Sequence, residues 1–348
     1  MRPPQRLTGN AHPAPGSGMT TMKAVVRDAY CSPDALELRD IGRPVPGDDD
    51  VLVRVHAAGV DHGVWHLVTG LPYLVRLVGY GLFKPKARVP GLDVAGRVEA
   101  VGRNVTRFRP GDEVFGTCTG ALAQYACARQ DMLAPKPANI TFEQAAAVPT
   151  SAFAALQALR DSGRLRAGQQ VLIIGAGGGV GTFAVQLAKA LGADVTGVCG
   201  TTKTDLVRSI GADEIIDYTR EDLTDGARRY DLILDTAGNR SLSRLRRALG
   251  PRGTLVLVGA QGGGRWLQGS DRQVRAMMLS RFMSQNLRGL MSTAREQDLH
   301  LLRGYIEAGQ VTPIVDRTYP LSEVREAIGY VREGHAAGKV VITLQDLL

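Results

Sequence analysis

A glycine-rich stretch, Gly175–Gly181, constrains the fold of this chain more than any other feature. The apolar run Val171–Ile174 precedes it, and Thr182–Leu191, a run with helical periodicity, follows it. Glycine adopts backbone conformations closed to other residues, and the free N–H groups at a helix start attract an anion. The pattern therefore predicts a strand–loop–helix unit that holds the diphosphate of a dinucleotide. The residues expected to form the cradle are Gly175, Gly178, Gly179, Val180 and Gly181.

Further strand and helix patterns follow this stretch. A lone glycine motif also fits a tight turn that binds nothing, whereas repeated βα units are the setting in which it binds a dinucleotide. Apolar strands joined by helices predict a parallel sheet covered on both faces, which is the doubly wound Rossmann arrangement. We expect strands at Val195–Val198, Glu214–Asp217, Tyr230–Asp235 and Thr254–Val258, and helices at Asp205–Ile210 and Ser241–Leu249.

The 348 residues suffice for two domains of about 150 residues each. Up to residue 137 short β-like runs between Gly/Pro turns predict a small barrel or sandwich, so the fold class is α/β. Thr141 and Gln144 form a capping-box pattern at the first helix of the next part, and Lys339–Thr343 is a closing strand that can return to the first domain. The expected boundaries are a disordered tail over 1–21, a β-barrel-like domain over 22–145, a nucleotide-binding domain over 146–285 and a return to the first domain over 286–348.

The charge balance is basic, with 42 Lys and Arg against 34 Asp and Glu and a net charge of +8. These charges are spread along the chain, which favours an ordinary solvated surface over a nucleic-acid interface. No apolar run approaches the ~18 residues of a membrane helix. The four cysteines stand far apart without a Cys-x-x-Cys pair, as is typical of a reduced cytoplasmic protein. We therefore expect no nucleic-acid or membrane partner and a cytoplasmic location.

The end of the second predicted βα strand indicates which dinucleotide is bound. NAD sites usually carry an Asp or Glu there, which binds the ribose 2′-hydroxyl. The segment Val198–Lys203 has no acid and offers Thr201, Thr202 and Lys203, whose hydroxyl and ammonium groups suit a 2′-phosphate. A solvated Lys203 at a helix start fits the same pattern. We expect the cofactor to be NADPH.

Several motifs outside the glycine-rich stretch match one family. In chain order they are Pro90–Val98 with Val101 and Gly102, Phe108–Gly116, Ala145–Pro149, Asp235–Gly238 and Ala337–Val341. With them the chain resembles the medium-chain dehydrogenase/reductase superfamily, and within it the zinc-independent quinone oxidoreductase-like branch, from Met22 to Leu348. The resemblance implies a co-chaperonin-like β-barrel catalytic domain, built from both chain ends, with a Rossmann domain inserted between them. It also implies a homodimer.

The positions of the zinc ligands distinguish this chain from the zinc-containing members. Those members carry a Cys where Asp61 stands and a Gly-His-Glu where Gly91-Leu92-Asp93 stands. Leucine cannot bind a metal, and a catalytic zinc needs about three protein ligands. Asp61 and Asp93 look like two isolated carboxylates in the sequence, so we expect no metal.

The resemblance also indicates the residues of the site. His66 and Asp61 are the expected catalytic residues, although relatives often have Asn at the position of Asp61. His66 has a pKa near operating pH and could donate a hydrogen bond or proton to a developing oxyanion, or it could be a loop histidine without chemistry. The apolar stretch Leu71–Phe83 is either a substrate lid or a barrel cover. Cofactor contacts are further expected at Thr150 and, at the carboxyl end of a strand, at Val258, Gly259 and Ala260.

These features together predict an NADPH-dependent oxidoreductase that transfers a hydride to a quinone or an α,β-unsaturated carbonyl compound. A conjugated acceptor spreads the incoming charge, so hydrogen-bond donors can replace the Lewis acid that a simple carbonyl requires. Two alternatives stay open. One is a dedicated enoyl reductase of a biosynthetic pathway, and the other is a non-catalytic NADPH-binding redox sensor.

Overall fold

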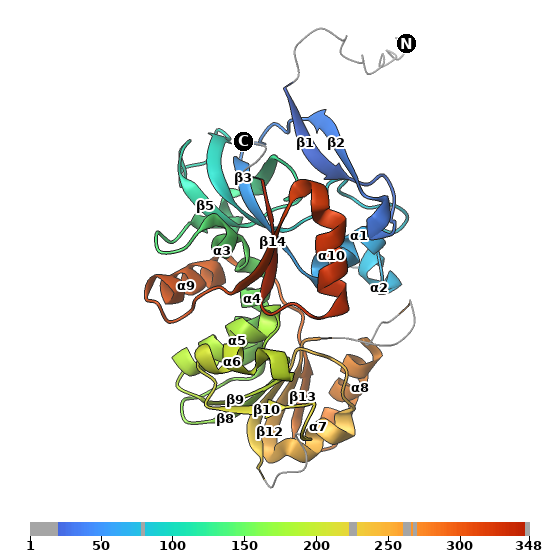
Figure 1. Cartoon of the computed structure of the whole chain (residues 1–348), viewed down its shortest axis with the longest axis vertical. Helices are drawn as coiled ribbons and strands as arrows, with labels where there is room; N and C mark the ends of the chain where they lie inside the picture. The colour runs from blue at the N-terminus through green and yellow to red at the C-terminus, as the bar shows by residue number, and fades with distance from the viewer. Residues whose placement is uncertain (1–19, 78–80, 223–227, 260–265, 267–269, 345–348) are drawn as a thin grey trace, which may run out of the picture.

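Two domains are stacked along the long axis of the molecule (Figure 1). The computed structural model describes residues 20–77, 81–222, 228–259, 266 and 270–344. The domain at the top of Figure 1 is formed by segments from both ends of the chain, and the domain below it by the middle. The predicted α/β fold, with a barrel-type domain and a Rossmann domain, is confirmed.

The barrel-type domain is built on a seven-stranded sheet. Its strands follow the order β14-β15-β3-β4-β5-β7, and β6 also pairs with β3. A separate antiparallel ribbon consists of β1 and β2, and it begins one residue before the predicted first strand. The bounds are β1 (Thr21–Val26), β2 (Glu37–Gly42), β3 (Asp50–Val60), β4 (Asp93–Val101), β5 (Glu113–Thr117), β6 (Tyr125–Arg129), β7 (Leu133–Pro135), β14 (Val315–Pro320) and β15 (Lys339–Thr343).

The closing strand β15 brings the end of the chain back to β3. The two strands are antiparallel, with Val340 opposite Val60, and this register places Lys339 beside Asp61. β3 is also antiparallel to β4, with Ala58 opposite Val94, so Asp93 at the start of β4 lies at the same edge. Three charged residues that are far apart in the sequence are thereby brought to one end of adjacent strands.

Short helices surround this sheet and join the domains. They are α1 (His62–Thr69), α2 (Tyr73–Val75), α3 (Phe142–Ala146), α4 (Pro149–Gln157), α9 (Glu296–Glu307) and α10 (Val324–Glu333). Thr141 and Gln144 form the predicted capping box at α3. The 3-10 helices are η1 (Pro33–Ala35), η3 (Gln130–Met132), η5 (Thr201–Lys203) and η6 (Leu321–Glu323), and η4 (Ala158–Ser162) is a π-helix. No helix within the described ranges has the length and apolar character needed to cross a membrane.

The second domain contains a six-stranded parallel sheet in the order β10-β9-β8-β11-β12-β13. This is the 3-2-1-4-5-6 order of a Rossmann fold, in which ligands bind where the order reverses, between β8 and β11. The sheet's last strand lies beyond the boundary expected at residue 285, because β13 pairs in parallel with β12. The bounds are β8 (Gln170–Ile174), β9 (Asp194–Cys199), β10 (Glu214–Asp217), β11 (Tyr230–Asp235), β12 (Leu249–Leu257), β13 (Asn286–Gly289), α5 (Gly179–Ala190), α6 (Thr204–Ser209), α7 (Leu242–Ala248) and α8 (Ser270–Ser280).

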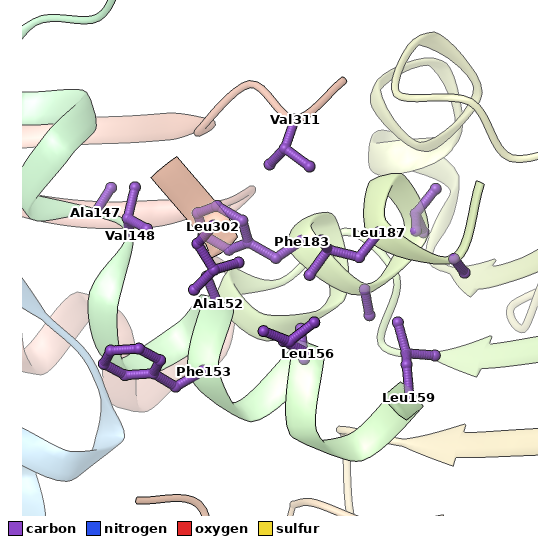
Figure 2. Packing of buried hydrophobic residues seen from close by; sticks show 14 of the residues in the cluster. Ala147, Val148, Ala152, Phe153, Leu156, Leu159, Phe183, Leu187, Leu302 and Val311 are labelled. Atoms are coloured by element: carbon purple, nitrogen blue, oxygen red, sulfur yellow. The ribbon is translucent and has the colours of Figure 1, made fainter. Parts of the chain in front are cut away.

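A continuous apolar core links the domains through α4 and α5. Figure 2 shows Ala152 and Leu156 of α4 beside Phe183 and Leu187 of α5, and Leu302 of α9 reaches the same cluster. These side chains are almost completely buried. The base of α5 is thus packed firmly, which holds its first turn in place relative to the barrel-type domain.

Candidate functional site

The glycine-rich stretch forms the predicted turn between β8 and α5. Gly175 has a φ of +81°, in the left-handed region that favours glycine, and a Cβ there would lie 2.5 Å from Thr236 Oγ1. A Cβ at Gly181 would fall on the carbonyl oxygen of Gly175. Both positions therefore require glycine for the loop to close this tightly.

The first turn of α5 offers free N–H groups. Thr182 N–H donates to the carbonyl of Gly178, which is the first bond of the helix, so the N–H groups of Gly179, Val180 and Gly181 precede the intrahelical ladder. Gly178 at the N-cap has no side chain to bond them. A bare helix start beside a close-fitting glycine loop is a cradle that suits a diphosphate. The structure places Gly175, Gly178, Gly179, Val180 and Gly181 together at this turn, and their binding of a diphosphate stays a prediction.

Lys203 lies over this cradle. Its side chain crosses Gly177, where a Cβ would lie 2.8 Å from Lys203 Cδ, and its Nζ donates to the carbonyl of Ala336 at 2.7 Å. Burial lowers the pKa of Lys203. Thr201 and Thr202 are exposed on the same turn, η5. The ammonium group thus stands at the cradle, tied to a backbone segment of the other domain.

Two side chains near this turn were not singled out from the sequence. Asp217, at the end of β10, accepts a hydrogen bond from Thr201 Oγ1 at 2.5 Å, and its other oxygen accepts from the N–H and hydroxyl of Thr219. The hydrogen bond from Thr201 contributes most to lowering the pKa of Asp217, so this carboxylate is ionised. Tyr218 lies 3.1 Å from the position of a Cβ on Gly200. Only the parallel pairing of β9 with β10 reveals these neighbours.

The strand ends β11 and β12 complete the edge of the sheet. The N–H groups of Val258 and Gly259 both donate to the carbonyl of Asp235. A Cβ on Gly259 would fall on the backbone of Thr236, so the chain passes closely there. Val258 and Gly259 therefore lie at the same carboxyl edge as the cradle, whereas Ala260 lies outside the described residues.

The segment before β15 reaches the cradle from the barrel-type domain. Gly338 N–H donates to the carbonyl of Gly177 at 3.2 Å, and Gly178 and Gly338 form an isolated parallel bridge. The next residue, Lys339, is close enough that a Cβ on Gly179 would lie 3.2 Å from Lys339 Cδ. The two domains therefore meet at the start of α5.

Lys339 lies in a buried charge cluster, which we define as Asp61, Asp93 and Lys339. Lys339 Nζ is 3.2 Å from Asp61 Oδ2 and 3.6 Å from Asp93 Oδ2, and it donates to Ser151 Oγ at 3.1 Å. The side chains of Lys339 and Asp93 are each 1% exposed, and that of Asp61 is 18% exposed. The two carboxylates that the sequence presented as isolated therefore share one ammonium group, and that interpretation was wrong because it could not include the strand register.

Asp93 also connects β4 to the start of α4. Thr150 donates to it twice, through its N–H at 3.1 Å and its hydroxyl at 2.5 Å. Asp93 thus caps α4 from a distant strand. Both donors of Thr150, its N–H and its O–H, therefore bond Asp93. Toward a cofactor Thr150 can only accept a hydrogen bond, through the lone pairs of its hydroxyl oxygen.

Asp61 precedes α1 as its N-cap, and His66 lies further along the same helix. Asp61 is the N-cap and accepts the N–H of Val64 at 3.3 Å. His66 Nδ1 is 2.5 Å from the carbonyl oxygen of Leu71. Because a carbonyl only accepts, Nδ1 carries the proton, and a neutral His66 has only a lone pair at Nε2. Burial lowers the pKa of His66, which favours this neutral form.

The predicted lid segment lies beside a pocket of about 460 Å³ in the barrel-type domain. Leu71, Tyr73 and Arg76 of that segment line it together with Tyr30 and Trp65. The ring of Tyr73 also contacts Trp266 edge-on, with centroids 5.1 Å apart, so the segment touches the other domain. Residues 78–80 of the predicted lid lie outside the described residues.

The donor atoms at the zinc-ligand positions do not fit a zinc site. Leu92 has no ligand atom, and the carboxylates of Asp61 and Asp93 are already paired with the ammonium of Lys339, which would repel a second cation. Within the described part of the chain, no group of three or more His, Cys, Asp or Glu side chains is arranged to bind a metal ion.

Comparisons with known proteins agree with this architecture. The chain matches the sequence models of the alcohol dehydrogenase GroES-like domain over residues 47–138 and of the zinc-binding dehydrogenase over residues 210–342, a range that contains none of Asp61, Leu92 and Asp93. Human quinone oxidoreductase is 32% identical over 339 residues, which covers 94% of this chain and 99% of that protein. The chloroplastic NADPH-dependent alkenal/one oxidoreductase of Arabidopsis thaliana is 33% identical over 344 residues, covering 92% of this chain and 79% of that protein.

A solved structure supports the same assignment. The quinone oxidoreductase from Coxiella burnetii has a TM-score of 0.80 at 27% identity, covering 94% of this chain and 100% of that one. The cradle, the sheet order and this full-length likeness agree with one another. The chain therefore belongs to the medium-chain dehydrogenase/reductase superfamily, in its quinone oxidoreductase-like branch.

Proposed function

We propose that this protein is an NADPH-dependent reductase that delivers a hydride to a quinone or an α,β-unsaturated carbonyl compound. The observation that carries the proposal is the direct contact between the cradle at the start of α5 and the buried charge cluster, through Gly178, Gly338 and Lys339. The first suits a dinucleotide and the second supplies ionisable groups beside it. The names of the human and Arabidopsis relatives, a quinone oxidoreductase and an alkenal/one oxidoreductase, support the acceptor class.

NADPH would supply the hydride, and different residues suit its diphosphate, its 2′-phosphate and its nicotinamide. We assign the diphosphate to the N–H groups of Gly179, Val180 and Gly181, because these precede the intrahelical ladder. We assign the 2′-phosphate to Lys203, with the exposed hydroxyl of Thr202 beside it, whereas the O–H of Thr201 is donated to Asp217. We further assign Thr150, Val258 and Gly259 to the nicotinamide end, where the two domains meet.

Asp217 bears on the choice between NADPH and NADH. A free carboxylate at this turn would repel a 2′-phosphate and bind a 2′-hydroxyl instead. Both oxygens of Asp217 already accept hydrogen bonds from Thr201 and Thr219, and Arg220 lies 3.5 Å from one of them. Its hydrogen-bonding capacity is therefore directed to the protein, which leaves less of it for a 2′-hydroxyl, but its negative charge stays and Lys203 has to offset it for a 2′-phosphate to bind.

A conjugated acceptor suits the groups present. Hydride addition to a simple carbonyl concentrates charge on one oxygen, where a Lewis acid contributes strongly, whereas a quinone or enone spreads that charge. The donor set around Asp61 and Leu92 does not fit zinc, so fixed hydrogen bonds must stabilise the developing anion. Of the two predicted catalytic residues, a neutral His66 has no free N–H to donate, and the pKa of Asp61 is held below its usual range, so Asp61 donates only after it has received a proton.

The decisive experiment measures the loss of NADPH absorbance with a panel of quinones, enones and simple aldehydes, and repeats it with NADH. We expect turnover of quinones or enones with NADPH and little turnover of aldehydes. Tight NADPH binding without turnover of any acceptor would contradict the proposal and favour a redox sensor. A lower KM for NADH than for NADPH would contradict the assignment of Lys203.

We also propose that the protein is a homodimer joined at the β13 edge of the Rossmann sheet. β13 pairs only with β12 among the described strands, and an unpaired edge favours association with another chain. Large apolar side chains are exposed on α8 and just before and after β13, namely Met277, Met278, Phe282 and Met291. Light scattering after gel filtration should give twice the chain mass, and Phe282→Glu should lower it. A monomeric wild-type protein would refute this proposal.

A further inference from the structure

The buried charge cluster contains more negative than positive groups. Lys339 contributes one ammonium, and Asp61 and Asp93 contribute two carboxylates within 3.2 and 3.6 Å of it. Ser151 and Thr150 add only neutral hydroxyls. With both carboxylates ionised the cluster would carry a net negative charge in a site where at least two members are 1% exposed. A buried unbalanced charge is costly, so the cluster gains stability by binding one proton.

We propose that this cluster is a proton store, which keeps one proton on Asp93 at neutral pH and passes it through Lys339 and Asp61 to the anion that hydride addition leaves on the substrate. The delivery step rests on the proposed function, whereas the storage of the proton does not.

The surroundings of the two carboxylates assign them different roles. Asp93 faces Lys339, Asp61, Thr150 and the buried Cys118, and burial first and the charge of Asp61 next raise its pKa to about 7, against the opposing effect of Lys339. Asp61 faces Lys339, His62 and His66, and it also bonds the Val64 N–H. Burial acts to raise the pKa of Asp61, but the charge and hydrogen bond of Lys339, with the Val64 N–H and His62, together outweigh it and hold this pKa below its usual range. Asp93 is thus the member that holds the proton.

The exposure of the three charged side chains indicates which of them releases the proton. The side chain of Asp61 is 18% exposed, whereas those of Asp93 and Lys339 are 1% exposed. Asp61 also caps the helix that carries His66, on the side of the barrel-type domain that meets the cradle. Asp61 is the most exposed of the three charged members, so we take it as the outlet for the proton. Asp93 and Lys339 act through it and are positioning residues, while Asp61 is the group beside the substrate.

The transfer balances with a quinone as acceptor. A hydride carries two electrons and one proton, and its addition leaves a hydroquinone monoanion that requires one more proton. An N–H bond of the Lys339 ammonium breaks as an O–H bond forms at Asp61, and this O–H bond breaks as the hydroquinone O–H forms. The neutral amine left at Lys339 then takes the proton of Asp93, whose O–H bond breaks as an N–H bond forms. Asp93 is left ionised and regains its proton from water by the reverse route.

The first test needs no substrate. Infrared spectra of the full chain, recorded as pH is raised, should show the carbonyl stretch of a protonated carboxylic acid disappearing near neutral pH. Asp93→Asn should lack this band. Asp298→Asn is the matched control, because Asp298 is equally buried but balanced by Arg160, and it should keep the band. Asp61→Asn removes the excess negative charge without touching Asp93, so the band should disappear at lower pH than in the wild type.

The second test measures delivery. With NADPH and 1,4-naphthoquinone, kcat of the wild type and of Asp298→Asn should fall as pH rises through the midpoint of the infrared band. Asp93→Asn should lose this dependence and on the order of 100-fold in kcat at low pH. Absence of the band from the wild type, its persistence in Asp93→Asn, or an unchanged midpoint in Asp61→Asn would overturn the proton store. A band that behaves as expected in a protein that reduces no quinone or enone would overturn the delivery and the proposed function, but not the storage.

Discussion

Replacement of Lys203 by alanine tests whether this residue selects NADPH. In the structure the Lys203 ammonium donates to the carbonyl of Ala336 at 2.7 Å, and its side chain crosses Gly177. Two roles are therefore possible in principle: a ligand of the 2′-phosphate, and a tie between the domains. A hydrogen bond to a charged group contributes about 1.5–3 kcal/mol, and every 1.4 kcal/mol is about a factor of ten in affinity. Lys203→Ala should therefore raise the Kd for NADPH by about ten- to a hundred-fold.

NADH has no 2′-phosphate, so its Kd should stay within about a factor of two in Lys203→Ala, since surface changes away from a contact are usually small. Titration calorimetry at fixed ionic strength measures both constants, because binding to a phosphate depends on salt.

Lys189→Ala is a matched control for this substitution. Lys189 belongs to the same domain and also donates to a backbone carbonyl, that of Ala193 at 2.9 Å, but it lies in the last turn of α5, away from the cradle. It should leave the Kd of both dinucleotides unchanged. Equal losses of NADPH and NADH affinity in Lys203→Ala, together with a lower Tm, would show that Lys203 acts only as the tie to Ala336 and would refute the reasoning.

Three further predictions concern the cradle, the histidine and the core. Gly181→Ala should abolish binding of both dinucleotides and lower the free energy of unfolding in urea melts by about 1–3 kcal/mol, because the new Cβ would fall on the Gly175 carbonyl oxygen. Gly329→Ala is the control: nothing lies within 4 Å of a Cβ there, so the free energy of unfolding should rise by about 0.5–1 kcal/mol. The pKa of His66 is lowered, so near this pKa the folded chain binds fewer protons than the unfolded chain. The free energy of unfolding should therefore fall as pH drops below about 6.5. Urea melts between pH 5 and 7 measure this fall, and His66→Asn should make it less steep. Leu156→Ala should cost about 2–5 kcal/mol in the same melts, while the exposed Leu301→Ala should change stability by less than about 0.5 kcal/mol; equal losses would contradict the core in Figure 2.

Local features were predicted well because their causes are local. The cradle depends on consecutive glycines between an apolar run and a helical one, and all of these lie within neighbouring residues. The capping box of Thr141 and Gln144 joins residues three apart. Hydrophobic periodicity likewise indicated each strand of the Rossmann sheet up to β12. β13 was missed, because Asn286–Gly289 has a single apolar side chain, Leu287, and its pairing with β12 is decided by the sheet.

The chemistry of His66 needed more than residue type. The sequence presented an imidazole with an ordinary pKa near operating pH, whereas the structure directs its Nδ1 proton to Leu71 and buries the ring. Likewise, the sequence correctly showed no acid between Val198 and Lys203, but Asp217 reaches the same turn from the adjacent strand. A side chain's protonation and partners depend on its three-dimensional surroundings.

The sequence by itself determined the class of fold, the position of the glycine-rich turn between a strand and a helix, and the absence of a ligand atom at Leu92, because turn conformations and side-chain chemistry are properties of short segments. Only the tertiary structure decided that Lys339 lies between Asp61 and Asp93, since Lys339 and Asp61 are 278 residues apart. Their meeting depends on the register of β15, β3 and β4, and register is set by the packing of the whole sheet.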